Sequence, residues 1–182
     1  MGDLTALANL FDPEKRSCRA VIETPRGKRN KFDYDPSTGL FMLGGLLPEG
    51  MVFPFDFGFI PATLGADGDP LDVIVLMDAS AHVACLLEVR LIGVITAEQT
   101  QDGKTEKNNR LIGVAMHSYD HEQLGSINDL STTFLAQLEA FFVSYNKVRG
   151  KKFQVTGTGG ARKAVECVRI GMRSYQKSQP KT

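Results

Sequence analysis

The sequence predicts a mainly β (α+β) protein in which short strands close into a barrel and helices pack outside it. Three observations lead to this prediction. Up to about residue 125 the chain alternates short apolar runs with turn residues, one run at 73–77 is apolar throughout, and two amphipathic segments close the chain. Many short strands followed by helices are typical of a closed barrel with helices outside it.

The predicted strands are separated by turn residues. Pro36 and Gly39 bound a turn, and Asp102-Gly103 is a hairpin turn signal inside a polar excursion between the last two strands. The run at 73–77 has the pattern of a strand covered on both faces, and residues 51–53 lead into an aromatic loop at 55–59. We expect strands at 20–23, 31–34, 40–42, 73–77, 86–95 and 111–116.

Two amphipathic helices are predicted after these strands. Ser131 or Asp129 can cap the first helix, whose apolar residues recur at helical spacing from Phe134 to Tyr145 and which Gly150 ends. The apolar positions of the second helix are Ala161, Val165, Val168 and Met172.

Composition limits the partners and the compartment. A chain of 182 residues that is 42% hydrophobic can bury one substantial core, so we expect one domain over residues 1–175 and a flexible tail over residues 176–182. The 21 basic and 21 acidic residues balance, which gives no electrostatic case for a nucleic-acid or anionic-membrane partner. No apolar run approaches the ~20 residues of a membrane span, and the N-terminus lacks a secretory pattern. Three widely spaced cysteines favour reduced thiols and a cytoplasmic protein.

Three carboxylates, those of Asp67, Asp69 and Asp72, lie within six residues just before the 73–77 strand. Their charges repel one another, and a hard divalent cation offsets that repulsion. Gly68 permits a tight backbone path and Pro70 stiffens it. Mg²⁺ takes few protein carboxylates and completes its shell with water and phosphate oxygens. A solvated turn is the alternative. Three carboxylates at this spacing favour a Mg²⁺-binding loop that handles phosphate oxygens.

The pattern Asp-Gly-Asp-Pro-Leu-Asp-Val at 67–73 matches the signature of the family I soluble inorganic pyrophosphatases. The resemblance extends from about Ala20 to about Phe153 and includes the family's aromatic stretch, here 51–61, and its late helix, here 141–145. It implies an OB-like five-stranded barrel with two or more flanking helices. It also implies hydrolysis of pyrophosphate to two phosphates, with several Mg²⁺ ions per site or Mn²⁺ or Co²⁺ in their place. The bacterial members that it resembles in length are homo-hexamers, so the implied assembly is a homo-oligomer.

The resemblance assigns roles to the acidic residues. Asp67 and Asp72 would bind metal, and Asp69 would accept the proton of the attacking water. Glu23 would belong to an outer acidic shell.

The resemblance also assigns two phosphate-binding residues. Lys31 and Tyr145 would contact phosphate oxygens, and Phe57 keeps the ring but not the hydroxyl of a Tyr that the family has in its aromatic stretch. From the residues alone, Lys31 and Glu23 are equally a cross-strand surface ion pair, and Tyr145 a half-buried helix residue.

Some phosphate-binding positions depart from the family's pattern. Gly44 or Gly45 aligns with an Arg that grips phosphate, and Asn146 aligns with a Lys. Lys151 or Lys152 is the available substitute for that Lys.

The second acidic segment departs most. Gln99 and either Asn108 or Asn109 align with two carboxylates, and Arg110 stands for a Lys and can grip phosphate bidentately. An Asn oxygen can ligate Mg²⁺ but carries no charge, so the site would hold fewer cations.

Two acidic residues of this segment are predicted to complete the metal site. Glu98 would be a metal ligand if the strand register shifts by one residue. The alternative is that Glu98 is a solvated residue at the edge of the sheet. Asp102 or Glu106 would fold inward from the hairpin, and we predict Asp102.

Three functions remain open at this point. The first is Mg²⁺-dependent hydrolysis of pyrophosphate, and the second is a catalytically weakened relative that binds a phosphorylated ligand or a partner. The third is an OB-type nucleic-acid module, because alternate Phe residues from 53 to 59 can stack bases. The balanced charge and the acidic loop argue against the third function.

Overall fold

Nine β-strands, two α-helices and two short 3₁₀ helices form the part of the chain that the computed structural model describes, residues 2–179. The strands are β1 (Ser17–Thr24), β2 (Asn30–Asp35), β3 (Leu40–Leu46), β4 (Asp56–Ile60), β5 (Leu71–Leu76), β6 (Leu86–Gln101), β7 (Lys104–Lys107), β8 (Arg110–Ala115) and β9 (Lys152–Gly160). The helices are η1 (Leu4–Ala6), η2 (Ile127–Asp129), α1 (Thr132–Val148) and α2 (Ala161–Ser178).

Five of these strands close into a ring in the order β1-β4-β5-β8-β6, because β6 pairs with β8 along one edge and with β1 along the other. β5 and β8 are parallel, and the other neighbours in the ring are antiparallel. β7 and β9 extend from β6, while β2 and β3 form a separate hairpin. The predicted mainly β fold, an OB-like five-stranded barrel with flanking helices, is confirmed.

β5 has buried side chains on both faces, as its uninterrupted apolar pattern predicts. Val73 and Val75 pack in a cluster with apolar residues of α2, whereas Ile74 and Leu76 pack in a second cluster with residues of α1. Burial on alternate faces of one strand therefore joins the two helices to the same barrel.

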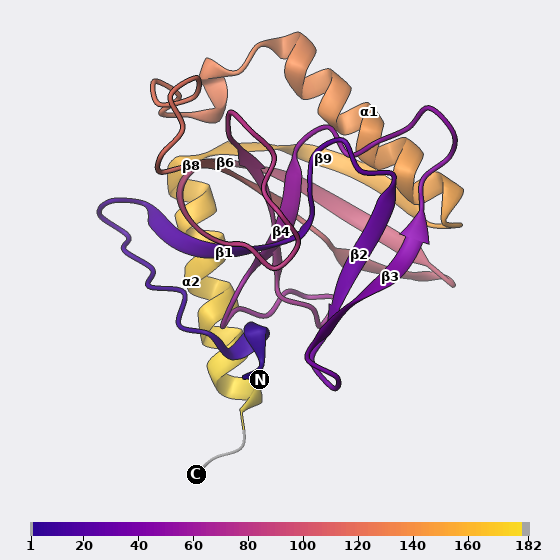
Figure 1. The fold of residues 1–182 in the computed structure, drawn as a ribbon, viewed down its shortest axis with the longest axis horizontal. Helices are drawn as coiled ribbons and strands as arrows, with labels where there is room; N and C mark the ends of the chain where they lie inside the picture. The colour runs from indigo at the N-terminus through magenta and orange to yellow at the C-terminus, as the bar shows by residue number, and fades with distance from the viewer. Residues whose placement is uncertain (1, 180–182) are drawn as a thin grey trace.

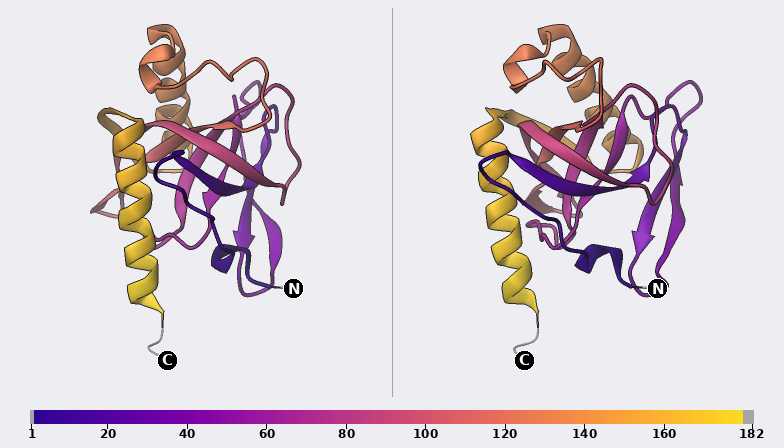
Figure 2. Two further views of the ribbon diagram at one scale, coloured as in Figure 1. Left: turned by 90° about the vertical axis from the view of Figure 1, so that its left-hand side faces the viewer. Right: turned by 60° about the vertical axis from the view of Figure 1, so that its left-hand side comes forward.

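The two helices lie against different parts of the barrel. Figures 1 and 2 show α1 over one end and α2 along the side, with the β2–β3 hairpin across the barrel from α2. Ser131 caps α1 by accepting the backbone N–H of Phe134 at 3.1 Å, and Gly150 follows its end at φ 72°. The predicted N-terminal and C-terminal signals of α1 are confirmed.

The hairpin turn between β6 and β7 is also confirmed. Gln101 pairs with Lys104, and both intervening residues, Asp102 and Gly103, have positive φ values of 51° and 78°. A two-residue loop with positive φ at both positions suits the twist of an antiparallel pair.

Three strands, β4, β7 and β9, were not among those predicted. Residues 55–59, predicted as an aromatic loop, belong largely to β4, and residues 51–53 are not in a strand. Gly58 explains this difference, because a Cβ there would lie 1.9 Å from the carbonyl oxygen of Val21, so glycine permits β4 to approach β1. β9 was not predicted because its glycines interrupt the apolar pattern, and it is held by pairing along β6.

The C-terminal segment is a further correction. Residues 176–178, predicted to be the start of a flexible tail, form the last turn of α2, where the charge of Lys177 is favourable near the negative end of the helix dipole. Residues 180–182 lie outside the described part of the chain. Among residues 2–179, neither α-helix is long and apolar enough to span a membrane.

Candidate active site

The acidic loop, residues 64–72, lies after β4 and includes the first two residues of β5, Leu71 and Asp72. It is closed by two internal hydrogen bonds: the N–H of Gly65 donates to the carbonyl of Asp69 at 2.7 Å, and the N–H of Asp69 donates to the side-chain Oδ1 of Asp67 at 3.3 Å. Gly68 adopts φ 89°, a conformation that favours glycine. These contacts leave the side chain of Asp69 exposed to solvent.

Helix α2 supports the acidic loop. The N–H of Leu64 donates to the carbonyl of Gly171 at 3.0 Å, and Thr63 Oγ1 accepts the N–H of Leu71 at 3.0 Å. A Cβ at Gly171 would lie 2.7 Å from Leu71 Cδ1, so glycine at this position lets the loop close on the helix. The acidic residues are therefore carried by a loop tied to a rigid element.

Arg110 forms an ion pair with Asp72, because parallel pairing of β8 with β5 places the starts of the two strands side by side. The Arg110 side chain is only 5% exposed. Its guanidinium carbon lies 5.8, 5.4 and 5.4 Å from the ring centres of Phe57, Phe142 and Phe153. Phe57 thus forms one wall around a buried cation, and among residues 2–179 Arg110 Nε has no hydrogen-bond partner.

Two residues with neutral amide side chains, Asn108 and Asn109, immediately precede Arg110 in the sequence. Asn108 Oδ1 accepts a hydrogen bond from the Arg110 guanidinium, and Asn108 Nδ2 donates to Gln99 Oε1 at 3.2 Å. Asn109 instead supports the barrel, because its Oδ1 accepts the N–H of Ala97 at 3.2 Å. Gln99 of β6 is therefore connected to Arg110 through Asn108, which lies between β7 and β8.

The structure does not bring the predicted ligands Glu98 and Asp102 to the acidic loop. Side chains alternate along a strand, so the side chain of Glu98 points away from the face that carries Gln99, and it is exposed. Asp102 is exposed in the β6–β7 turn. In the described part of the chain, neither residue forms a hydrogen bond or ion pair with the acidic loop.

Glu23 and Lys31 come from β1 and β2. Glu23 Oε1 accepts the N–H of Tyr34 at 2.9 Å, and Lys31 pairs with Asp33, its same-face neighbour two residues along β2. The Lys31 side chain is 11% exposed, so the alternative of a surface Glu23–Lys31 ion pair does not describe it. Asp33 occupies the space beside Gly44, where a Cβ would lie 1.5 Å from Asp33 Oδ2.

Tyr145 is buried on α1, and its hydroxyl accepts a hydrogen bond from Arg149 Nη1 at 2.5 Å. Its ring lies 5.7 Å from Phe53 and is stacked at 6.0 Å on Phe141. The next residue, Asn146, is buried and donates to the carbonyl of Phe142 at 2.8 Å, within its own helix.

The pKa shifts show that these groups act on one another. Burial raises the pKa of Glu23 to about 7, the charge of Lys31 opposes that rise, and the charges of Asp72 and Asp69 add to it. Burial and the charge of Asp72 raise the pKa of Asp67 to about 6. Burial also raises the pKa of Asp72 and lowers that of Lys31. Carboxylates from β1 and from the acidic loop therefore share one electrostatic site.

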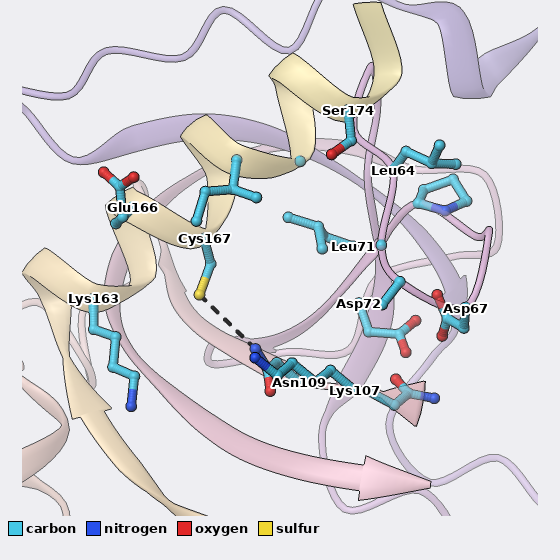
Figure 3. Close-up of a pocket in the computed structure, with 16 residues that line it drawn as sticks. Leu64, Asp67, Leu71, Asp72, Lys107, Asn109, Lys163, Glu166, Cys167 and Ser174 are labelled. Atoms are coloured by element: carbon cyan, nitrogen blue, oxygen red, sulfur yellow. Dashed lines mark hydrogen bonds between the residues drawn. The ribbon is translucent and has the colours of Figure 1, made fainter. Parts of the chain in front are cut away.

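A cavity of about 450 Å³ lies between the acidic loop and α2. Figure 3 shows Asp67 and Asp72 on one side of this cavity and Cys167 and Glu166 of α2 on the other. The two aspartates thus have an open space beside them in spite of their partial burial.

The donor set fits a hard divalent cation. Among residues 2–179 no three His, Cys, Asp or Glu side chains are already gathered into a metal cage. Asp67 and Asp72 nevertheless offer only oxygen donors and line the same cavity. The charge of Asp72 raises the pKa of Asp67, so a cation bound between them would relieve the repulsion between the two carboxylates. Glu23 adds a third carboxylate to the same field.

Sequence reasoning missed some residues at this site. Asp33 was detectable, since residues two apart on a strand share a face and Asp33 follows Lys31 at that spacing. The resemblance aligned Gln99 with a carboxylate, but the hydrogen bond from Asn108 to Gln99 depends on the register of β6, which the sequence does not give. Arg149 contacts the Tyr145 hydroxyl, and nothing in its local sequence marks it.

Comparison with known proteins agrees with this architecture. A family model described as inorganic pyrophosphatase matches residues 20–176. The inorganic pyrophosphatase of Thermus thermophilus is 35% identical over 159 residues, which cover 86% of this chain and 89% of that protein. Soluble inorganic pyrophosphatase 2 of Chlamydomonas reinhardtii is 35% identical over 164 residues, with coverages of 90% and 82%. The crystal structure of the T. thermophilus enzyme superposes with a TM-score of 0.87 at 32% identity, over 96% of this chain and 99% of that one.

The fold and the site together define an OB-like barrel hydrolase with an acidic loop facing buried cations. The chain belongs to the inorganic pyrophosphatase family. The resemblance to family I and the predicted enzyme class, inorganic diphosphatase, are thereby confirmed.

Proposed function

We propose that this protein hydrolyses inorganic pyrophosphate to two phosphates in a reaction that requires Mg²⁺. The convergence of the acidic loop with Arg110 and Lys31 carries this proposal, because a polyanionic substrate needs cations and its cleavage needs an activated water. The family assignment supports it, since the relatives are named inorganic pyrophosphatase.

Asp67 and Asp72 would hold the metal ion, with Glu23 in the outer acidic shell. A divalent cation bound there neutralises phosphate oxygens and lowers the pKa of a water. Mg²⁺ suits an all-oxygen donor set, and Mn²⁺ or Co²⁺ would be its substitutes. Asp69 is exposed beside these ligands and would accept the proton of the attacking water.

The cations and hydroxyl of the site would hold the phosphate oxygens. Arg110 is fixed in orientation by three aromatic rings and by its ion pair with Asp72, so its guanidinium is preorganised for an oxyanion. Lys31 would supply a second positive charge from β2, and Tyr145 would donate its hydroxyl. Burial raises the pKa of Tyr145 to about 12, which keeps that hydroxyl protonated and able to donate.

A specific observation favours a weakened site as the second candidate. Gln99 and Asn108 hydrogen-bond to each other where two carboxylates would attract further cations. Two neutral amides support fewer metal ions than two carboxylates, so we expect a lower metal occupancy and a slower enzyme than a site with both acids. In the limiting case the protein binds a phosphorylated ligand or a partner without turnover.

The remaining parts of the proposal concern the assembly and the compartment. We expect a homo-oligomer, with a hexamer as the form suggested by the bacterial relatives that the sequence resembles. We expect a cytoplasmic location, which is supported by the free cysteines of the described chain.

Phosphate release tests the proposed function. Chelator-treated protein is supplied with pyrophosphate and with Mg²⁺, Mn²⁺ or Co²⁺ in turn, and inorganic phosphate is measured over time. Release that depends on the metal and is lost in Asp69→Asn supports the proposal. No release with any of the three metals contradicts turnover and leaves the weakened, ligand-binding form.

A further inference from the structure

We propose that Arg149 is a substrate-binding residue that contacts a phosphate group of pyrophosphate from the β3 side of the site. This inference rests on the proposed function and adds to it a third cation, supplied by α1. Arg149 follows α1 as its C-cap residue, one helical turn after Tyr145.

The guanidinium of Arg149 is held in place although the residue is exposed. Its Nη1 donates to the Tyr145 hydroxyl at 2.5 Å, and its Cζ lies 5.3 Å from the centre of the Tyr145 ring. Tyr145 is buried among aromatic residues, so the aromatic ring that orients Arg149 is itself rigid. A surface arginine fixed in this way loses little conformational entropy when it binds an anion.

The same guanidinium reaches the β2–β3 hairpin. A Cβ built on Gly45 would lie 3.6 Å from Arg149 Nη1, and Gly45 pairs with Lys31 in the hairpin. The charges of Arg149 and Arg110 both lower the pKa of Lys31, which places the three cations within electrostatic reach of one another. Position 45 is therefore a direct neighbour of the Arg149 guanidinium.

Arg149 has no carboxylate partner in the described part of the chain. Arg110 pairs with Asp72 and Lys31 pairs with Asp33, but no ion pair within residues 2–179 involves Arg149. A preorganised guanidinium beside two other cations is electrostatically unfavourable unless an anion is bound between them. A guanidinium fork matches the oxygens of a phosphate group, so pyrophosphate is the ligand that this arrangement suits.

The experiment separates loss of binding from loss of folding. Arg149→Ala removes the cation, and Arg149→Lys keeps the charge without the fork. Lys147→Ala is the matched control, because Lys147 is an exposed cation in the last turn of the same helix. KM and kcat for Mg-pyrophosphate are measured, together with calorimetric binding of methylene diphosphonate, a non-hydrolysable analogue, and the melting temperature.

We expect Arg149→Ala to raise KM and to weaken analogue binding about ten- to a hundredfold, the range of a charge-assisted hydrogen bond, with an unchanged melting temperature. Arg149→Lys should fall between Arg149→Ala and the wild type. Lys147→Ala should stay within about twofold of the wild type, because Lys147 is exposed and forms no ion pair within residues 2–179. If both Arg149 variants match Lys147→Ala in KM and in analogue binding, the inference is wrong.

A relocated cation provides a second test. Since a side chain at position 45 enters the space of the Arg149 guanidinium, Gly45→Arg in the Arg149→Ala background should recover part of the lost analogue binding.

If wild-type protein binds the analogue but hydrolyses nothing, the proposed turnover fails, while the role of Arg149 is still decided by the binding data. If the wild type hydrolyses pyrophosphate and neither variant changes binding, only the role of Arg149 fails. A wild type that neither binds nor hydrolyses refutes both.

Discussion

Replacing Arg110 with Met removes the cation that neutralises Asp72 while keeping a side chain of similar length. The two side chains are 5% and 22% exposed, so the ion pair is largely buried. Loss of one partner from a buried pair costs roughly 3–5 kcal/mol, and the residual exposure of Asp72 favours the lower end, about 3 kcal/mol. Urea unfolding at one fixed protein concentration measures this change, because the stability of an oligomer varies with concentration. Hydrolysis should fall about 10²- to 10³-fold, the effect of removing one oxyanion-stabilising donor.

A double-mutant cycle shows whether the ion pair is the cause. Asp72→Asn removes the buried charge that Arg110→Met leaves unpaired, so the double variant should be more stable than the sum of the two single changes, by about 1–3 kcal/mol. Arg173→Met is the matched control, since Arg173 and Glu166 form an exposed pair with exposures of 63% and 50%, and its cost should be about 1 kcal/mol or less. Additivity within about 0.5 kcal/mol would refute the electrostatic account of this pair.

Three other changes test the support of the site, a surface turn and the strand register. Gly171→Val should lower both hydrolysis and the melting temperature, because even a Cβ there would lie 2.7 Å from Leu71 and would displace the acidic loop. Unchanged activity would contradict the support of the acidic loop by α2. Hydrogen bonds from the turn after β8 lower the pKa of Asp78 to about 2, so its stabilising effect is present above the unfolded-state pKa of about 3.9 and is lost as the pH falls through 2. Asp78→Asn should therefore reduce the melting temperature at pH 7 and make progressively less difference below pH 4, and a difference that is constant with pH would argue against this carboxylate. Gln99→Asp should tighten Mg²⁺ binding measured by calorimetry, while Glu98→Gln should leave it unchanged. If Glu98→Gln weakens Mg²⁺ binding and Gln99→Asp has no effect, Glu98 is the ligand.

Much of the site was predictable because its chemistry is local in sequence. The acidic loop has its carboxylates, its positive-φ Gly68 and its following strand within one short segment, and each of these properties is encoded by adjacent residues. The Ser131 cap and the Asp102-Gly103 turn are equally local. Arg110 was named from the resemblance, and its place at the start of a strand follows from the clear apolar pattern of that strand.

The register of β6 was not predictable from the sequence. Side-chain direction along a strand has a period of two, so one extra residue exchanges the faces. The pairing of β6 shifts between Leu91 and Gly93 against β8 and between Thr96 and Ala97 against β9. The first shift is an extra residue in β6, Ile92, which exchanges the faces of the strand, whereas the second is an extra residue in β9, Thr156. After the first shift Glu98 is exposed, and Gln99 instead hydrogen-bonds to Asn108.

Contacts between distant segments were also hidden. Arg149 lies far from Gly45 in the sequence, and only the packing of α1 against the barrel end brings its guanidinium to the β2–β3 hairpin. The strand β4 was hidden for the same reason. In the sequence Gly58 resembles a turn residue, and only the fold shows that a Cβ there would lie 1.9 Å from the carbonyl oxygen of Val21 in β1. Local patterns indicate which residues can turn or pair, but not which distant backbone they approach.

We propose that the acidic loop catalyses metal-dependent hydrolysis of pyrophosphate with Asp69 as the proton acceptor. The most direct measurement compares initial rates of phosphate release from Mg-pyrophosphate by the wild type, by Asp69→Asn and by Glu98→Gln, each first shown to have the wild-type melting temperature. We expect release by the wild type and by Glu98→Gln, and a loss of about 10²- to 10⁴-fold in Asp69→Asn, the range for removal of a general base. Wild-type rates in Asp69→Asn, or no release by any of the three proteins, would contradict it.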